Sequence, residues 1–191
     1  AARFDELLRR PDLDLDIRGR ALMARGIGQL WQGHMQAALD SYAASLAIWQ
    51  QAGDAVQEAL AHLNIGIVAY ELHDYGRAEA ELLHAGQLLR AAQVITWMPT
   101  VWNELGLVYR DQGRWQEALE NFERARAQRQ AEGSMHRAGV MLNNIGEVLL
   151  LQGQIEDAEA AFHEALAKLT VHNVRIDTFV NLGLLRQMRG D

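Results

Sequence analysis

The chain has 191 residues, of which 49% are hydrophobic, a composition typical of a folded protein rather than a disordered one. Its formal net charge of -7 and the lack of a basic run argue against direct binding to DNA or RNA. The absence of cysteine excludes disulfides, cysteine nucleophiles and thiolate zinc sites. No apolar stretch reaches the roughly 18 residues of a membrane span, so we expect no membrane contact and a cytoplasmic location.

One glycine recurs at a fixed spacing along the sequence. Gly26, Gly66, Gly106 and Gly146 lie 40 residues apart, and Gly183 follows 37 residues later. The apolar residues around them follow a helical period, and a self-similarity of this length indicates one helical unit stacked several times. A glycine inside a helix costs about 1 kcal/mol relative to alanine. We therefore expect each copy to allow a close approach of a partner helix.

The predicted units begin near residues 19, 59, 99 and 139, and a lone final helix begins near residue 174. Residues 1–16 are interpreted as the remnant of an upstream repeat helix and a linker. Residues 17–191 are predicted to form a single repeat domain. In each full unit the first helix carries the recurrent glycine, and the second helix has a small residue on its facing side. These small residues are Ala38, Ala78, Ala118 and Ala158.

Turn and cap signals separate the predicted helices. The first helices are followed by Gly33, Gly113, Gly153 and Gly190, where a left-handed backbone is favoured. His73 fills the corresponding turn of the second unit less favourably. Between units, Gly53 predicts a helix end and Asp54 predicts the cap of the next helix. Gly133 and Ser134 are predicted to do the same before the fourth unit.

The third unit contains the series Trp102, Leu105, Gly106, Tyr109, Ala118 and Phe122. This series resembles the tetratricopeptide-repeat signature, and the resemblance extends over roughly residues 19–190. The unit of 40 residues is longer than the usual 34, which predicts longer helices. It is similar to the long-unit arrays of Pins/LGN-type scaffolds, kinesin light chains and bacterial signalling ATPases. The resemblance implies an all-α, right-handed α-solenoid of antiparallel helix pairs, the tetratricopeptide superhelix.

In that family the first helices line a concave groove. The resemblance implies that a peptide-binding groove is formed here by Asn64, Ile67, Tyr70, Asn103, Glu104, Leu107, Arg110, Asn143, Asn144, Glu147 and Asn181. Asparagine is a mediocre helix former, so its recurrence needs a reason. Either the amides bond the backbone of a bound peptide, or each bonds a neighbouring helix and holds the repeat geometry. Both alternatives stay open.

Arg110 and Tyr70 are the expected specific anchors, because arginine and tyrosine are frequent at interface hot spots. The alternative for Arg110 is an ion pair with Glu147 or Asp111. The groove positions contain no lysine and one clear arginine. The family's mode of gripping a C-terminal carboxylate is therefore not expected.

Catalytic chemistry has little support in the sequence. The seven histidines are scattered over different repeat positions. Glu81 and His84 have the spacing of half a di-iron motif, but the second copy is missing, and we interpret this pair as part of a solvated helix face. We expect no enzyme, no cofactor and no metal site.

These observations predict a protein–protein interaction scaffold that binds a peptide or a helical segment in the groove, as a piece of a larger bacterial protein. The alternative is the sensor or regulatory arm of a signalling ATPase or transcription regulator, which responds to a small molecule or an intramolecular partner. The expected partner is a protein, a peptide or another domain of the same chain. The last helix is expected to expose Phe179, Leu182 and Leu185, which self-association or another partner would cover.

Overall fold

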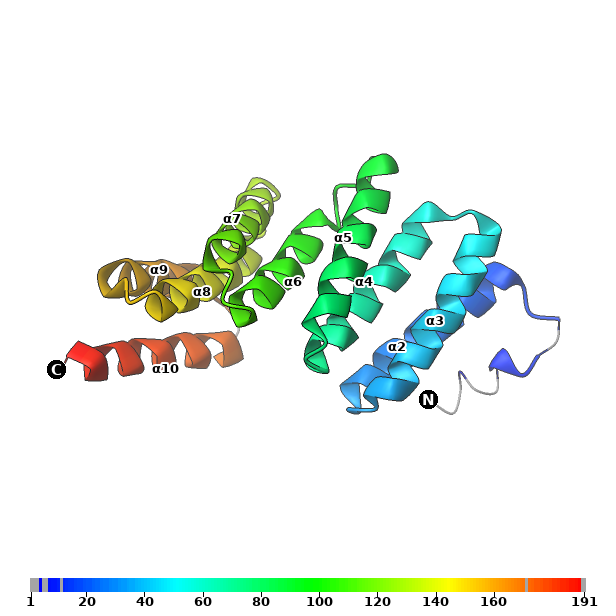
Figure 1. Ribbon diagram of the computed structural model, residues 1–191, viewed down its shortest axis with the longest axis horizontal. Coiled ribbons are helices and arrows are strands. Elements are labelled where there is room, and N and C mark those ends of the chain that lie inside the picture. Colours follow the sequence, from blue (N-terminus) through cyan, green and yellow to red (C-terminus); the bar gives the residue numbers. More distant parts are fainter. Residues whose placement is uncertain (1–3, 5–6, 11, 171, 190–191) are drawn as a thin grey trace. The chain divides into compact units, whose positions relative to one another are not determined.

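The computed structural model describes residue 4 and residues 7–10, 12–170 and 172–189. These residues form α-helices and no β-strand, so the predicted all-α class is confirmed (Figure 1). Contacts divide the chain after Trp97 into two compact units, residues 1–97 and residues 98–191. Each unit is described by itself. The single domain over residues 17–191 and the upstream remnant over residues 1–16 stay predictions.

The first unit contains two antiparallel helix pairs. Its helices are α2 (Leu15–Trp31), α3 (Met35–Ala52), α4 (Ala55–Glu71) and α5 (Tyr75–Ala91). Helix α2 packs on α3, α3 on α4, and α4 on α5. Each predicted helix pair is therefore present, and α2 and α4 begin four residues before the predicted unit starts near 19 and 59.

The second unit continues the same pattern and adds one helix. It contains α6 (Met98–Asp111), α7 (Trp115–Ala131), α8 (Met135–Leu151), α9 (Ile155–Lys168) and α10 (His172–Arg189). Consecutive helices pack on one another, and α8 also contacts α6 and α10. The first helices α6, α8 and α10 thus lie next to one another within this unit. No helix of the described residues is long and apolar enough to cross a bilayer.

The predicted boundary signals are present at most positions. Gly53 ends α3 with a φ of 69°, and the Asp54 carboxylate accepts a hydrogen bond from the Gln57 backbone N–H at 3.0 Å. Gly133 is also left-handed, with a φ of 72°. Ser134 differs from the prediction, because its hydroxyl makes no capping hydrogen bond to α8.

The turns between first and second helices also follow the prediction. Gly33, Gly113 and Gly153 have φ values of 76°, 74° and 75°. His73 adopts the same left-handed conformation with a φ of 59°, although its Cβ makes this conformation unfavourable. Gly190 lies outside the described residues.

Four of the recurrent glycines lie against a large side chain of the following helix. The pairs are Gly26 with Tyr42, Gly66 with Leu82, Gly106 with Phe122 and Gly146 with Phe162. A Cβ at these glycines would come within 2.5 to 2.8 Å of the partner side chain, which is far inside van der Waals contact. The partners themselves are fully buried. The close helix approach predicted from the glycine spacing is therefore confirmed at these four positions.

Gly183 differs, because nothing described lies within 4 Å of a Cβ placed there. The prediction for the exposed face of α10 was wrong for two of its three residues. Phe179 is 53% exposed, but Leu182 and Leu185 are buried in a cluster with Phe162 of α9. A first helix has one apolar side toward the preceding repeat and another toward its own second helix. Leu182 and Leu185 lie on the side toward the preceding repeat. Gly183 lies on the side where a second helix of its own would pack.

Candidate functional site

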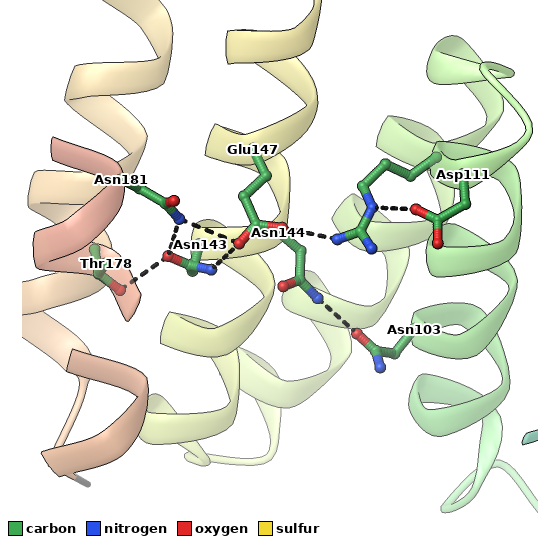
Figure 2. Close-up of polar contacts among 8 residues, drawn as sticks. Asn103, Asp111, Asn143, Asn144, Glu147, Thr178 and Asn181 are labelled. Carbon is green, nitrogen blue, oxygen red and sulfur yellow. Dashed lines mark hydrogen bonds and ion pairs between the residues drawn. The ribbon is translucent and has the colours of Figure 1, made fainter. Parts of the chain in front are cut away.

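Helices α6, α8 and α10 bring most of the predicted groove residues of the second unit together. We call this surface the α6–α8–α10 face and define it by Asn103, Arg110, Asn143, Asn144, Glu147 and Asn181 (Figure 2). The face is polar, and its side chains bond across the gaps between helices. Two further predicted residues, Glu104 and Leu107, are half-buried on α6.

Asn143 bonds residues of both α8 and α10. Its amide Nδ2 donates to Glu147 Oε1 at 2.8 Å, and its Oδ1 accepts from Thr178 Oγ1 at 2.9 Å. Asn181 Nδ2 donates to Glu147 Oε1 at 3.2 Å and approaches Asn143 Oδ1 at 3.5 Å. Because Asn143 and Thr178 are buried, these bonds satisfy polar groups that water does not reach.

Thr178 is a member of this network that sequence reasoning missed. It lies five residues before Gly183, a position that holds Ala21, Ala61, Val101 and Met141 in the other units. A hydroxyl at a position that is otherwise apolar was the signal that could have identified it. Its burial is complete, so its hydroxyl needs a partner within the protein.

Arg110 of α6 forms both of the ion pairs considered from the sequence. Its Nη1 lies 2.7 Å from Glu147 Oε2, and its Nε lies 2.8 Å from Asp111 Oδ1. The Arg110 side chain is only 18% exposed and that of Glu147 29%. Two carboxylates thus face one guanidinium in a partly desolvated position, where such bonds are stronger than at an open surface.

A second amide pair joins α6 to α8. Asn144 Nδ2 donates to Asn103 Oδ1 at 3.1 Å, and Asn103 Nδ2 donates to Glu104 Oε1 at 3.0 Å. The predicted groove asparagines of the second unit therefore bond neighbouring helices, as one of the two alternatives predicted. Their use in recognising a peptide backbone stays a prediction.

The remaining predicted groove residues belong to the first unit and are described apart from this face. Asn64 Nδ2 donates to the Leu60 carbonyl of its own helix at 2.7 Å and approaches Met23 Sδ of α2 at 3.5 Å. Ile67 and Tyr70 are half-buried on α4, and the Tyr70 ring lies 6.0 Å from the Tyr75 ring. Asn64 thus makes mainly a local contact, unlike Asn143.

A pocket of about 560 Å³ opens on the α6–α8–α10 face. Its lining residues are Arg110, Glu147, Leu150, Leu151, Asn181 and Met188. One part of the wall is therefore charged or amide-bearing, and the other is aliphatic. Leu151 and Met188 are 55% and 60% exposed, which is unusual for large apolar side chains unless they contact something else. Neither residue is among the predicted groove positions.

A separate polar cluster lies between α4 and α5 in the first unit. His62 Nδ1 and Glu81 Oε2 are 2.6 Å apart, and the His62 and His84 rings meet edge to face at 4.5 Å. The hydrogen bond with His62 lowers the pKa of the Glu81 carboxyl. The interpretation of Glu81 as part of a solvated face was therefore wrong, because its side chain is only 22% exposed and bonds to the neighbouring helix. His84 is exposed, as expected.

Comparison with known proteins agrees with the repeat geometry. Residues 97–170 match the family model of the tetratricopeptide repeat. No curated protein sequence matches the chain.

Several solved structures share the fold. BtubC from P. vanneervenii is 22% identical with a TM-score of 0.76, and the match covers 91% of this chain and 71% of BtubC. NprR, solved in complex with its cognate peptide NprX, is 16% identical with a TM-score of 0.78, over 98% of this chain and 55% of NprR. The apo form of RapI is 14% identical with a TM-score of 0.78, over 99% of this chain and 54% of RapI. The chain thus spans about half the length of NprR and RapI, and identities this low establish a shared fold alone.

Proposed function

We propose that this chain, a tetratricopeptide-repeat protein, is a protein-interaction scaffold that binds a peptide or a helical segment on the α6–α8–α10 face. The observation that carries the proposal is the pocket of about 560 Å³, whose wall is polar on one part and aliphatic on the other. Pockets that combine exposed apolar side chains with a few fixed polar groups are typical binding sites. Repeat arrays of this kind recognise partners through such shared surfaces rather than through a catalytic cluster.

The wall of the pocket limits the chemistry of the ligand. Leu150, Leu151 and Met188 offer a place for an apolar side chain, while the Asn181 amide can bond a peptide group. Arg110 already faces Glu147 and Asp111, so an anionic tail would have to replace an existing carboxylate. We therefore propose a ligand with an apolar anchor and no acidic terminus at this position.

The likeness to NprR supports the proposal. NprR has the same fold and was solved in complex with its cognate peptide NprX. The alternative of a sensor or regulatory arm stays a prediction, as do the bacterial origin, the cytoplasmic location and the lack of enzymatic activity. Self-association through α10 is also still a prediction, and its apolar surface would be Phe179, Val180, Leu184 and Met188 rather than Leu182 and Leu185.

The test is a selection of displayed random peptides on the purified chain, followed by fluorescence anisotropy with the enriched sequences. The double variant Leu151→Gln/Met188→Gln removes the exposed apolar wall without touching the core. We expect it to bind the enriched peptides at least about tenfold more weakly, a loss of about 1.4 kcal/mol.

The matched control is Leu72→Gln/Ile95→Gln, which replaces two apolar residues of similar exposure, 46% and 60%, that do not line the pocket. This control should bind as the wild type does. Equal binding by the pocket variant and the wild type, or the failure of any peptide to enrich, would contradict the proposal.

A further inference from the structure

The polar cluster between α4 and α5 consists of residues that no other repeat unit has at the same positions. The cluster contains Glu58, His62, Glu81 and His84. The corresponding residues are Arg18, Leu22, Ser41 and Ala44 in the first unit, Met98, Trp102, Asn121 and Arg124 in the third, and Ala138, Leu142, Ala161 and Glu164 in the fourth. Only the second unit therefore places two imidazoles and two carboxylates together.

The orientation of His62 is fixed by Glu81. The carboxylate Oε2 lies 2.6 Å from His62 Nδ1, and its other oxygen lies 3.8 Å from Arg77 Nε. A neutral imidazole that donates its Nδ1–H to a carboxylate presents the lone pair of Nε2 on the opposite side. This arrangement of carboxylate and histidine is the one that supports metal-binding imidazoles in proteins.

His62 Nε2 is fully buried and has no hydrogen-bond partner among the described residues. A buried polar atom without a partner is costly, so its surroundings need an explanation. The nearest carboxylate oxygen, Glu58 Oε1, is 4.0 Å away, which is too far for a hydrogen bond. That oxygen accepts a bond from Gln50 Nε2 of α3 at 3.3 Å instead.

The distances fit an ion between these groups better than a direct contact. One ligand atom each from Glu58, His62 and His84 lies within 4.8 Å of the others. Bonds of about 2.0 to 2.2 Å from nitrogen and oxygen ligands to Zn²⁺ place two ligands of one ion roughly 3 to 4 Å apart. The 4.0 Å between His62 Nε2 and Glu58 Oε1 already lies at the upper end of that range, and the exposed His84 side chain lies within 4.8 Å of both groups.

We propose that Glu58, His62 and His84 bind a divalent transition-metal ion of the Zn²⁺ class, with Glu81 as the carboxylate that orients His62. Two imidazoles and one carboxylate leave a fourth coordination position of a tetrahedral ion open. That position would accept water or a donor atom from a bound partner, and the exposed His84 gives the ion a route from solvent. The ion would tie α4 to α5.

The test is a titration of the purified, metal-free chain with ZnCl₂ against a chromophoric chelator, together with the absorption spectrum of the Co²⁺-loaded chain. We expect one ion per chain and a Co²⁺ spectrum of four-coordinate type. His84→Ala should abolish stoichiometric binding, and its exposure makes the variant safe for folding. Glu81→Gln should weaken binding by about 10- to 100-fold, the usual effect of removing an orienting carboxylate.

The matched control is His163→Ala in α9. His163 Nε2 lies 4.0 Å from Glu159 Oε1, the same distance and spacing as His62 and Glu58, but it is exposed and is not part of a comparable metal-ligand cluster among the described residues. This variant should bind as the wild type does. The proposal is overturned if the folded wild type binds no stoichiometric Zn²⁺, or if His84→Ala binds as tightly as the wild type.

Discussion

The α4–α5 pair and the α6–α7 pair have the same backbone plan but different chemistry. In both, a glycine of the first helix lies against a buried residue sixteen positions later, Leu82 in one pair and Phe122 in the other. Beside this shared contact, the α4–α5 pair has His62 and His84 where the α6–α7 pair has Trp102 and Arg124. Positions that pack one helix on another recur from unit to unit. The positions that differ therefore indicate residues with a function specific to one unit.

The largest expected effect tests the shared contact itself. Gly106→Ala places a Cβ 2.5 Å from the Phe122 ring and should lower the free energy of unfolding by about 2 to 3 kcal/mol, because the ring cannot move out of a packed interface. Gly183→Ala is the control, since nothing lies within 4 Å of its Cβ, and it should raise stability by up to about 1 kcal/mol. Urea denaturation measures both, and similar losses in the two variants would refute the account of the glycines.

The next effect compares the asparagines of the two units. Asn143→Ala removes the hub that bonds Glu147 and Thr178, and we expect a loss of about 2 kcal/mol in the free energy of unfolding. Asn64→Ala removes mainly a bond to the carbonyl of its own helix, and we expect a loss of no more than about 0.5 kcal/mol. Thermal and urea unfolding can rank the two, and a larger loss for Asn64→Ala would contradict the contrast.

A smaller effect concerns the hydroxyl of Tyr42, whose counterparts Phe122 and Phe162 have none. This hydroxyl is buried without a hydrogen-bond partner among the described residues, so Tyr42→Phe should raise the free energy of unfolding by about 1 kcal/mol. Burial also raises the pKa of Tyr42 from 10.0 to about 12.

The folded state therefore holds the Tyr42 proton more tightly than the unfolded state. The contribution of this difference to the free energy of unfolding is fully present below pH 10 and is lost as the pH rises toward 12. Urea unfolding at a series of alkaline pH values should show this decline in the wild type and a weaker one in Tyr42→Phe. Identical pH profiles would show that Tyr42 is not the group responsible.

The smallest effect concerns the turn of the second unit. His73→Gly gives the left-handed residue of this turn the same identity as Gly33, Gly113 and Gly153, and should raise the free energy of unfolding by about 0.5 kcal/mol. The gain is limited because the variant also loses the 3.0 Å bond between His73 Nδ1 and the Tyr75 hydroxyl. A destabilised variant would mean that this bond outweighs the backbone cost.

The repeat, its turns and its close contacts could be predicted from the sequence because they depend on local geometry. A glycine that recurs every 40 residues, or a glycine and an aspartate at a helix boundary, restricts the backbone wherever it occurs. Asp54 caps its helix as predicted, whereas Ser134 does not, because the rotamer of a cap residue depends on its own surroundings.

The partners of the polar side chains could be predicted only in part. The first-helix register placed Asn143, Asn144 and Asn181 on one face, but not which amide bonds which neighbour. The contact between His62 and Glu81 joins residues of two helices, so helical spacing within the pair Glu81 and His84 did not reveal it. The burial of Leu182 depended on which side of α10 faces α9.

Binding of a peptide to the α6–α8–α10 face can be followed residue by residue by NMR. An enriched peptide is titrated into isotope-labelled chain while the side-chain amide of Asn181 and the methyl groups of Leu150 and Leu151 are observed. If the peptide binds there, these signals shift together and saturate at one peptide per chain, with no comparable change for Leu72 or Ile95. Saturable shifts that leave Asn181, Leu150 and Leu151 unchanged would contradict it.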